Sequence, residues 1–108
     1  MKEETLNAIR AFVKERDWSQ YHTGENLAKS ISIEAAELLE LYQWEREASS
    51  IERVKEEIAD VLIYSLMFCD RYGLDPDEII LQKIKKNAEK YPVDLCKGSA
   101  KKYDELKK

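Results

Sequence analysis

The stretch Glu57-Ile-Ala-Asp-Val-Leu-Ile-Tyr-Ser-Leu-Met-Phe-Cys69 decides the fold, because Asp60 is its only charged residue after Glu57 and it contains neither Gly nor Pro. Such an apolar run predicts a helix that is buried on most of its sides. A lone carboxylate there would lose several kcal/mol of hydration free energy unless it were paired, protonated or bound to a metal ion. Arg53 and Lys55, the nearby cations, do not lie three or four positions from Asp60. Its partner therefore has to come from another element.

A second acidic couplet, Glu34-x-x-Glu37, lies in an earlier apolar helical pattern and resembles the couplet Glu57-x-x-Asp60. Residues three apart share a helix face, so two antiparallel helices could bring all four carboxylates around one site. Oxygen ligands in this number suit Mg²⁺ or Mn²⁺. A cation held in this way could support the chemistry of phosphate groups. We therefore expect these four residues to be both metal ligands and catalytic groups. The alternative is a set of ordinary solvated helix faces, the interpretation that we favour for Glu40, Glu45 and Glu56.

Composition favours an all-α fold in a single domain over residues 1–108. Charged residues make up 37% of the chain, which has only three Gly and two Pro, as expected for helices joined by short turns. The expected architecture is a compact four-helix bundle that forms oligomers. Apolar spacing and capping signals predict helices over about 6–16, 25–44, 49–73 and 75–91, a loop over 17–24 and a basic tail over 93–108.

Charge and cysteine content narrow the possible environments and partners. The net charge of −4 argues against a general nucleic-acid binder, whereas free nucleotides held through a metal remain compatible. Cys69 and Cys96 offer neither metal-ligand spacing nor a disulfide framework. The N-terminus is charged where a signal peptide needs an apolar core, and the apolar run is too short and too acidic to span a bilayer. We expect a soluble cytoplasmic protein without nucleic-acid or membrane partners.

The histidine and aromatic content narrows the possible chemistry further. His22 is the only histidine, which excludes di-iron bundles built on Glu-x-x-His motifs and most zinc hydrolases. Trp18 and Trp44 lie at the ends of predicted helices, where an aromatic ring can form a wall for a stacked base, although core packing is the default for such residues. Tyr64 follows Asp60 by one turn, so its hydroxyl group would point near a metal-bound ligand or else lie in the core.

Several short motifs from Phe12 onward match one known family. They are Arg16-Asp-Trp18, Tyr21-His22, Asn26-Leu27, Glu34-Ala-Ala-Glu-Leu-Leu-Glu40, Gln43-Trp44, Glu57-Ile-Ala-Asp-Val-Leu-Ile-Tyr64, Lys90-Tyr-Pro-Val93 and Lys97-Gly-Ser-Ala-Lys-Lys-Tyr103. With these motifs the chain resembles the MazG-like all-α nucleotide pyrophosphohydrolases, and within them the dCTP pyrophosphatase branch. The two couplets mark the superfamily, while the aromatic loop, the Gln-Trp pair and the tail point to the branch.

The resemblance implies an enzyme, a nucleoside triphosphate pyrophosphatase that cleaves between the α and β phosphates with Mg²⁺ as cofactor. It implies a role in nucleotide-pool house-cleaning and assembly into dimers or tetramers. The acidic residues Glu34, Glu37, Glu57 and Asp60 match the family's metal-binding carboxylates. The residues expected at the nucleotide are Trp18, Ser19, Gln20, Tyr21, His22, Asn26, Trp44 and Tyr64.

Base preference stays open between two main choices. The animal dCTP pyrophosphatases carry a histidine on the first helix where this chain has Ile9. Cytosine deoxynucleotides, including modified ones, are the first expectation, and dUTP or a broader set of non-standard dNTPs is the alternative. A different class of hypothesis is a non-catalytic helical interaction module, in which the carboxylates bind lysines of a partner.

Overall fold

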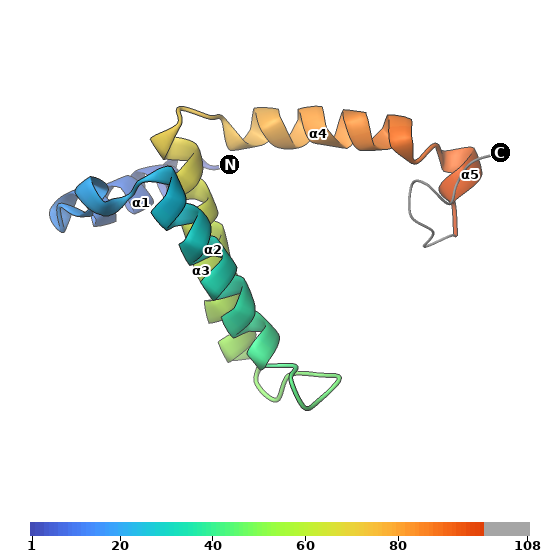
Figure 1. The fold of residues 1–108 in the computed structure, drawn as a ribbon, viewed down its shortest axis with the longest axis horizontal. Helices are drawn as coiled ribbons and strands as arrows, with labels where there is room; N and C mark the ends of the chain where they lie inside the picture. Colours follow the sequence, from blue (N-terminus) through green and yellow to red (C-terminus); the bar gives the residue numbers. More distant parts are fainter. Residues whose placement is uncertain (99–108) are drawn as a thin grey trace. The chain divides into compact units, whose positions relative to one another are not determined.

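The computed structural model describes residues 1–98, which consist of helices joined by short turns (Figure 1). The all-α prediction is confirmed for this part of the chain, which contains no strand. Residues 99–108, most of the predicted basic tail, lie outside the described residues. The helices are α1 (Glu3–Glu15), the 3-10 helix η1 (Trp18–Tyr21), α2 (Gly24–Glu40), α3 (Ile51–Arg71), α4 (Pro76–Lys90) and α5 (Val93–Cys96).

The chain divides into two units, with the boundary between Leu74 and Asp75. The first unit contains α1, η1, α2 and α3, and the second begins with α4. The single domain predicted over residues 1–108, and the four-helix bundle within it, stay predictions. None of the helices in residues 1–98 is long and apolar enough to cross a membrane.

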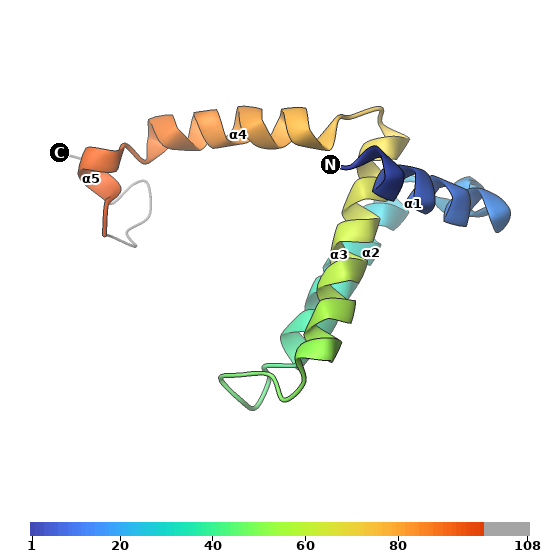
Figure 2. The same ribbon diagram turned by 180° about the vertical axis from the view of Figure 1, so that it is seen from behind.

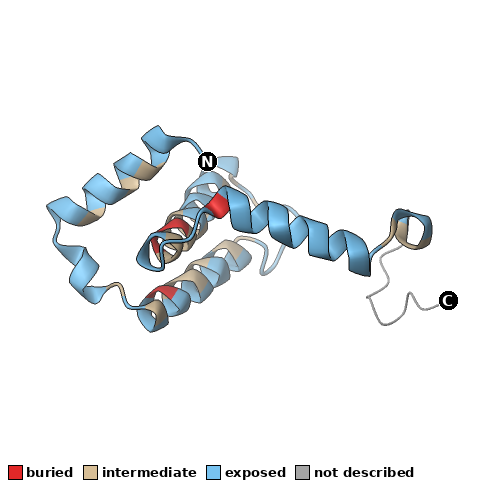
Figure 3. Cartoon of the chain, turned by 90° about the horizontal axis from the view of Figure 1, so that it is seen from above, coloured by how far each residue is buried: buried red, intermediate tan, exposed pale blue. Residues whose placement is uncertain are grey.

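An antiparallel hairpin of α2 and α3 forms the frame of the first unit, and the two helices lie side by side in both views (Figures 1 and 2). Its core is small. Among the described residues the buried hydrophobic side chains are Leu27 on α2 and Leu66 and Met67 on α3 (Figure 3). Full burial of such a side chain stabilises the fold by about 1.5–3 kcal/mol. The remaining length of the hairpin therefore leaves apolar side chains partly open to solvent.

The burial predicted for α2 and α3 is only partly correct. In the apolar helical pattern predicted over residues 25–44, Leu27 is buried, but Ala35 and Tyr42 are exposed. The prediction that α3 is buried on most of its sides is wrong within one chain, because Ile58 is 40% exposed and Leu62 is 51% exposed.

Helix ends follow local capping rules, with one shift. Thr23 caps α2 by accepting a hydrogen bond from the Asn26 backbone N–H at 3.1 Å, and Ser50 caps α3 by accepting one from the Arg53 N–H at 3.3 Å. The start predicted for this helix at Ser49 is therefore off by one residue. Two adjacent serines can both serve as caps, and the helix selects the one whose backbone is extended.

The predicted stop of α3 at Gly73 is confirmed. This residue has φ 64°, a conformation that glycine adopts without steric cost. The N–H of Leu74 donates to the Cys69 carbonyl at 2.8 Å, and the N–H of Gly73 donates to the Asp70 carbonyl at 3.2 Å. These two bonds make a Schellman motif that satisfies the last carbonyls of α3.

The segments on either side of α2 also differ from the sequence prediction. The segment 17–24 is not a plain loop, because Trp18–Tyr21 form η1 after Asp17, which adopts a left-handed backbone with φ 51°. Helix α2 ends at Glu40 rather than near Trp44. Beyond Glu40 the N–H groups of residues 41–43 donate to carbonyls three residues earlier, for example Tyr42 to Leu39 at 2.9 Å. This tighter winding ends the α-helix.

The second unit starts as predicted. The Asp75 side chain accepts hydrogen bonds from the N–H groups of Asp77 and Glu78, and Pro76 occupies the first turn of α4. This is a strong start signal, because the proline needs no N–H partner there. Helix α4 ends at Lys90, before Tyr91 and Pro92, and α5 follows within the predicted tail.

Candidate metal centre

Acidic side chains from α2 and α3 converge within the hairpin. Glu34 and Glu37 on α2 and Glu57 on α3 each offer a carboxylate oxygen, and these three atoms all lie within 4.8 Å of one another. The spacing of three residues places the two α2 carboxylates on one face, and the antiparallel neighbour supplies the third. Three negative groups at this separation repel one another unless a proton or a cation lies among them.

Burial makes this cluster costly. One oxygen, Oε2, of both Glu34 and Glu57 is buried without a hydrogen-bond partner. Desolvation is the main reason that the pKa of Glu34 rises to about 7, followed by a hydrogen bond with Glu37 and the charges of Glu37, Asp60 and Glu57. A bond between two carboxyl groups requires a proton on one of them. When that proton is lost, two negative carboxylates face each other, and the buried Oε2 of Glu34 still has no partner.

The pKa of Glu57 is also raised. Desolvation raises its pKa first, followed by the charge of Glu37, a hydrogen bond with Glu37 and the charge of Asp60, while the charge of Arg53 lowers it. No ion pair within residues 1–98 reaches the three clustered carboxylates. An all-oxygen donor set with unsatisfied buried atoms fits a hard divalent cation such as Mg²⁺ or Mn²⁺.

Asp60, the fourth predicted ligand, lies beside the cluster. Its oxygen is not part of the set within 4.8 Å. Its charge nevertheless raises the pKa of both Glu34 and Glu57, so the carboxylate is close enough to interact with them. It is half-buried and also lines the larger cavity of the first unit. Asp60 therefore links the acidic cluster to that cavity.

This cavity, of about 590 Å³, lies between α1, η1 and α3. Its wall is mainly apolar, and three of the predicted nucleotide-contacting residues, Trp18, His22 and Tyr64, line it together with Asp60. The volume falls within the range of small-molecule sites. An aromatic ring from η1 and a carboxylate near a possible cation thus open onto one space, which suits a ligand with a flat ring and a charged tail.

The other predicted contacts do not line this cavity. Ser19 lines a neighbouring hollow of about 400 Å³, which His22 also borders. The Gln20 side chain donates to the Asp17 carbonyl at 2.9 Å, and that of Asn26 donates to the Tyr21 carbonyl at 2.9 Å. These two amides therefore brace η1 and the turn after it.

Two aromatic residues predicted at the nucleotide are largely exposed within the chain. Tyr21 is 62% exposed, and Trp44, in the turn after α2, is 88% exposed. Neither lines the two cavities described above.

Sequence reasoning missed the role of α1 in the cavity. Thr5, Ala8, Ile9 and Phe12 form its α1 wall. Ile9 and Phe12 belong to an apolar stripe that indicates only that one face of α1 is covered. The rings of Phe12 and Trp18 form a T-shaped pair, with centroids 5.6 Å apart, and this contact joins α1 to η1.

Comparisons with known proteins point in one direction. A model of the MazG-like family matches residues 29–106. The protein named dCTP pyrophosphatase 1 from Rattus norvegicus is 38% identical over 117 residues, which cover 96% of this chain and 69% of the relative. The protein of the same name from Homo sapiens matches with the same identity and coverage. The crystal structure of a pyrophosphatase from Archaeoglobus fulgidus DSM 4304 is similar with a TM-score of 0.74 and 49% identity, covering 83% of this chain and 91% of that one.

Proposed function

The chain belongs to the MazG-like family and is a dCTP-diphosphatase-like enzyme, and we propose that it hydrolyses nucleoside triphosphates between the α and β phosphates. The products are a nucleoside monophosphate and pyrophosphate. The observation that carries the proposal is the cluster of Glu34, Glu37 and Glu57, in which one buried oxygen each of Glu34 and Glu57 has no partner and a divalent cation would supply one. Deoxycytidine triphosphate, unmodified or modified on the base, is the proposed substrate because the named relatives are dCTP pyrophosphatases.

The carboxylates have two tasks in this proposal. Glu34, Glu37 and Glu57, with Asp60 beside them, would hold Mg²⁺ or Mn²⁺. When bound, the cation would neutralise phosphate charge and lower the pKa of a water molecule. A carboxylate of the cluster would accept the proton of the attacking water, and any of the four can serve as this base. Their fixed positions on two packed helices keep the charges aligned without reorganisation during the reaction.

The apolar cavity would hold the nucleoside part. Trp18 would offer a ring face for stacking, which is tolerant of base identity, and His22 and Tyr64 would offer polar groups at the wall. Asp60 opens onto the same cavity, so a base held there would direct its phosphates toward the acidic cluster. Base preference among dCTP, modified dCTP, dUTP and other dNTPs would depend on this wall.

A homo-oligomer, a dimer or a tetramer, would be the functional form. Large apolar side chains along the hairpin are exposed within one chain, including Leu62 at 51%, Ile33 at 58% and Leu39 at 68%. A second copy would cover such surface, and it would offer Trp44 a partner that residues 1–98 of its own chain do not. Light scattering coupled to size exclusion would measure the mass directly, and a monomer at micromolar concentration would contradict this part.

The decisive experiment compares two neighbouring glutamates on α3. Pyrophosphate release is measured with Mg²⁺ over a panel of dCTP, 5-methyl-dCTP, dUTP, the other dNTPs and the ribonucleotides. Glu57→Gln removes a clustered oxygen, while Glu56→Gln makes the same change at an exposed position beside it. We expect Glu57→Gln to lose at least about 100-fold in activity and Glu56→Gln to keep it.

Each other outcome has a clear meaning. If the wild type cleaves no triphosphate, the enzyme assignment fails and the carboxylates have to be explained as a binding surface for a partner's lysines. If both glutamine variants retain activity, the acidic cluster is not the metal centre. If cleavage favours dUTP over dCTP, the reaction stands and the proposed base preference is wrong.

A further inference from the structure

An exposed ion pair joins the two helices that form opposite walls of the apolar cavity. Arg10 lies on α1, next to the wall residue Ile9, and Asp70 lies on α3, three residues after the wall residue Met67. We propose that Arg10 and Asp70 are positioning residues, which set the separation of the α1 and α3 walls and thereby the affinity for the nucleoside. This inference rests on the proposed function of the cavity.

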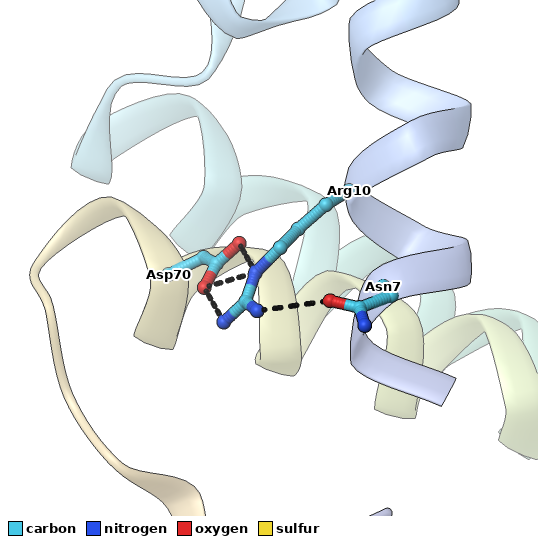
Figure 4. Close-up of polar contacts among 3 residues, drawn as sticks. All are labelled: Asn7, Arg10 and Asp70. Atoms are coloured by element: carbon cyan, nitrogen blue, oxygen red, sulfur yellow. Dashed lines mark hydrogen bonds and ion pairs between the residues drawn. The ribbon is translucent and has the colours of Figure 1, made fainter. Parts of the chain in front are cut away.

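The geometry of the pair is bidentate. Arg10 Nη2 donates to Asp70 Oδ1 at 2.8 Å, and Arg10 Nε donates to Oδ2 at 2.9 Å and to Oδ1 at 3.1 Å (Figure 4). The third nitrogen, Nη1, donates to Asn7 Oδ1 at 3.4 Å, one turn earlier on α1. A guanidinium held on both sides in this way has a fixed orientation, whereas a single long contact would leave it mobile.

Asp70 is not explained by the stability of α3 itself. It lies in the last turn of the helix, which ends at Arg71, where the helix dipole favours cations and opposes a carboxylate. The basic residue expected there is already present as Arg71. An acidic group at this end is therefore compensated mainly by Arg10, which comes from another helix.

Within the first unit, Arg10–Asp70 is an ion pair that joins α1 to α3, whereas the pairs of Arg16, Lys29 and Lys55 lie within one helix or between adjacent residues. Phe12 and Trp18 pack on each other, so η1 would follow any displacement of α1. The acidic cluster lies on α2 and α3 and would keep its geometry. Loosening α1 should therefore weaken substrate binding while leaving the chemical step unchanged.

The exposure of the Arg10 and Asp70 side chains limits the expected rise in KM. The side chains of Arg10 and Asp70 are 50% and 41% exposed, so water screens the pair and its coupling is modest. If loss of the pair leaves the binding-competent wall formed in about one fifth of the molecules, KM rises about fivefold. A much larger change would point to a direct role in the chemistry, which this geometry does not support.

The kinetic test uses single and double variants of the full chain. Asp70→Asn keeps the shape of the side chain and removes its charge, and Arg10→Gln removes the other partner. We expect each to raise KM for the preferred dNTP about fivefold with kcat within about twofold, and the double variant to be no worse than either single variant. The control is Glu52→Gln, which breaks an exposed pair with Lys55 within α3 and should leave KM unchanged.

A second readout separates failure of this inference from failure of the proposed function. In a Trp44→Phe background, Trp18 is the only tryptophan, and acrylamide quenching reports its exposure without any substrate. Asp70→Asn should increase quenching, and Glu52→Gln should not. Unchanged quenching together with unchanged KM, at equal helical content by circular dichroism, would overturn the positioning role. If the wild type hydrolyses no triphosphate and quenching still rises in Asp70→Asn, the proposed function fails. The role of Arg10 and Asp70 in positioning α1 would then stand.

Discussion

Replacing Glu34 by glutamine should stabilise the metal-free protein at pH 8 while removing a metal ligand. In the wild type, the Glu34 carboxylate is deprotonated at this pH against the charges of Glu37, Glu57 and Asp60, with one buried oxygen left without a partner. Glutamine has nearly the same shape but no charge. The gain therefore comes from the removal of repulsion and desolvation cost rather than from new packing.

The sign and size of this change in stability follow from the pKa shift of Glu34. Folding raises the pKa of Glu34 from 4.5 to about 7, so the folded state holds this proton more tightly than the unfolded state does. Stability from this group is fully present below pH 4.5 and is lost as pH rises through about 7. At about 1.4 kcal/mol for each pKa unit, the upper limit is about 3.5 kcal/mol. Because water reaches the side chain and screens it, about 1 kcal/mol is expected.

Magnesium should reverse the order of stability of the wild type and Glu34→Gln. Without metal at pH 8, Glu34→Gln should melt about 5 °C above the wild type, and the advantage should vanish near pH 4.5. With Mg²⁺ at a hundredfold excess over its dissociation constant, the wild type gains about 2.7 kcal/mol, whereas the variant, with a ligand missing, gains less. The wild type should then be the more stable of the two.

Differential scanning fluorimetry at fixed protein concentration measures both effects. Glu40→Gln, an exposed glutamate on the same helix, is the matched control and should shift neither melting curve. A Glu34→Gln variant that is less stable than the wild type at pH 8 without metal would refute the reasoning. It would mean that this carboxylate has a stabilising partner and is not part of a site that lacks its cation.

Other changes probe the fourth carboxylate, the cavity wall and the packing of the hairpin. Asp60→Asn should abolish pyrophosphate release with unchanged circular dichroism; retained turnover would remove Asp60 from the site. Trp18→Ala should raise KM about tenfold with little change in kcat if the base stacks on this ring, and equal KM values would exclude such stacking. Gly24→Ala should lower stability by about 1 kcal/mol, because its new methyl group would collide with the Tyr72 ring and hydroxyl. In a Tyr72→Ala background the same change should be neutral or stabilising, and a loss there would exclude the collision as the cause.

The helices could be predicted from the sequence because their signals are local. Asp75 followed by Pro76 starts α4, and Gly73 ends α3, each through hydrogen bonds made within a few residues. The convergence of Glu34 and Glu57 was also predictable, since two couplets on adjacent antiparallel helices can meet only across the hairpin. Where two residues could serve equally, as with Ser49 and Ser50, local rules did not select between them.

The cavity could not be predicted in the same way, because it depends on where α1 packs. Its apolar face indicates that something covers it but not what, and the ion pair that fixes its position joins residues 60 positions apart in sequence. The signal was present in one form: Asp70 is an acid in the last turn of an apolar helix, where a base is favoured. An ionisable residue at an electrostatically unfavourable position is a reason to search for its partner on another element.

Metal binding and self-association should be coupled through the stability of the first unit. The buried hydrophobic side chains of residues 1–74 are few. The first unit therefore has little stabilising free energy to offset the repulsion within its acidic cluster. Neutralising that cluster with a cation, or covering Leu62 and its exposed neighbours with a second copy, should each favour the folded hairpin. The two effects should therefore be coupled, and Mg²⁺ should tighten self-association measured by analytical ultracentrifugation. Self-association that is indifferent to Mg²⁺ in the wild type, and equal in Glu34→Gln, would show that cluster and interface are energetically independent.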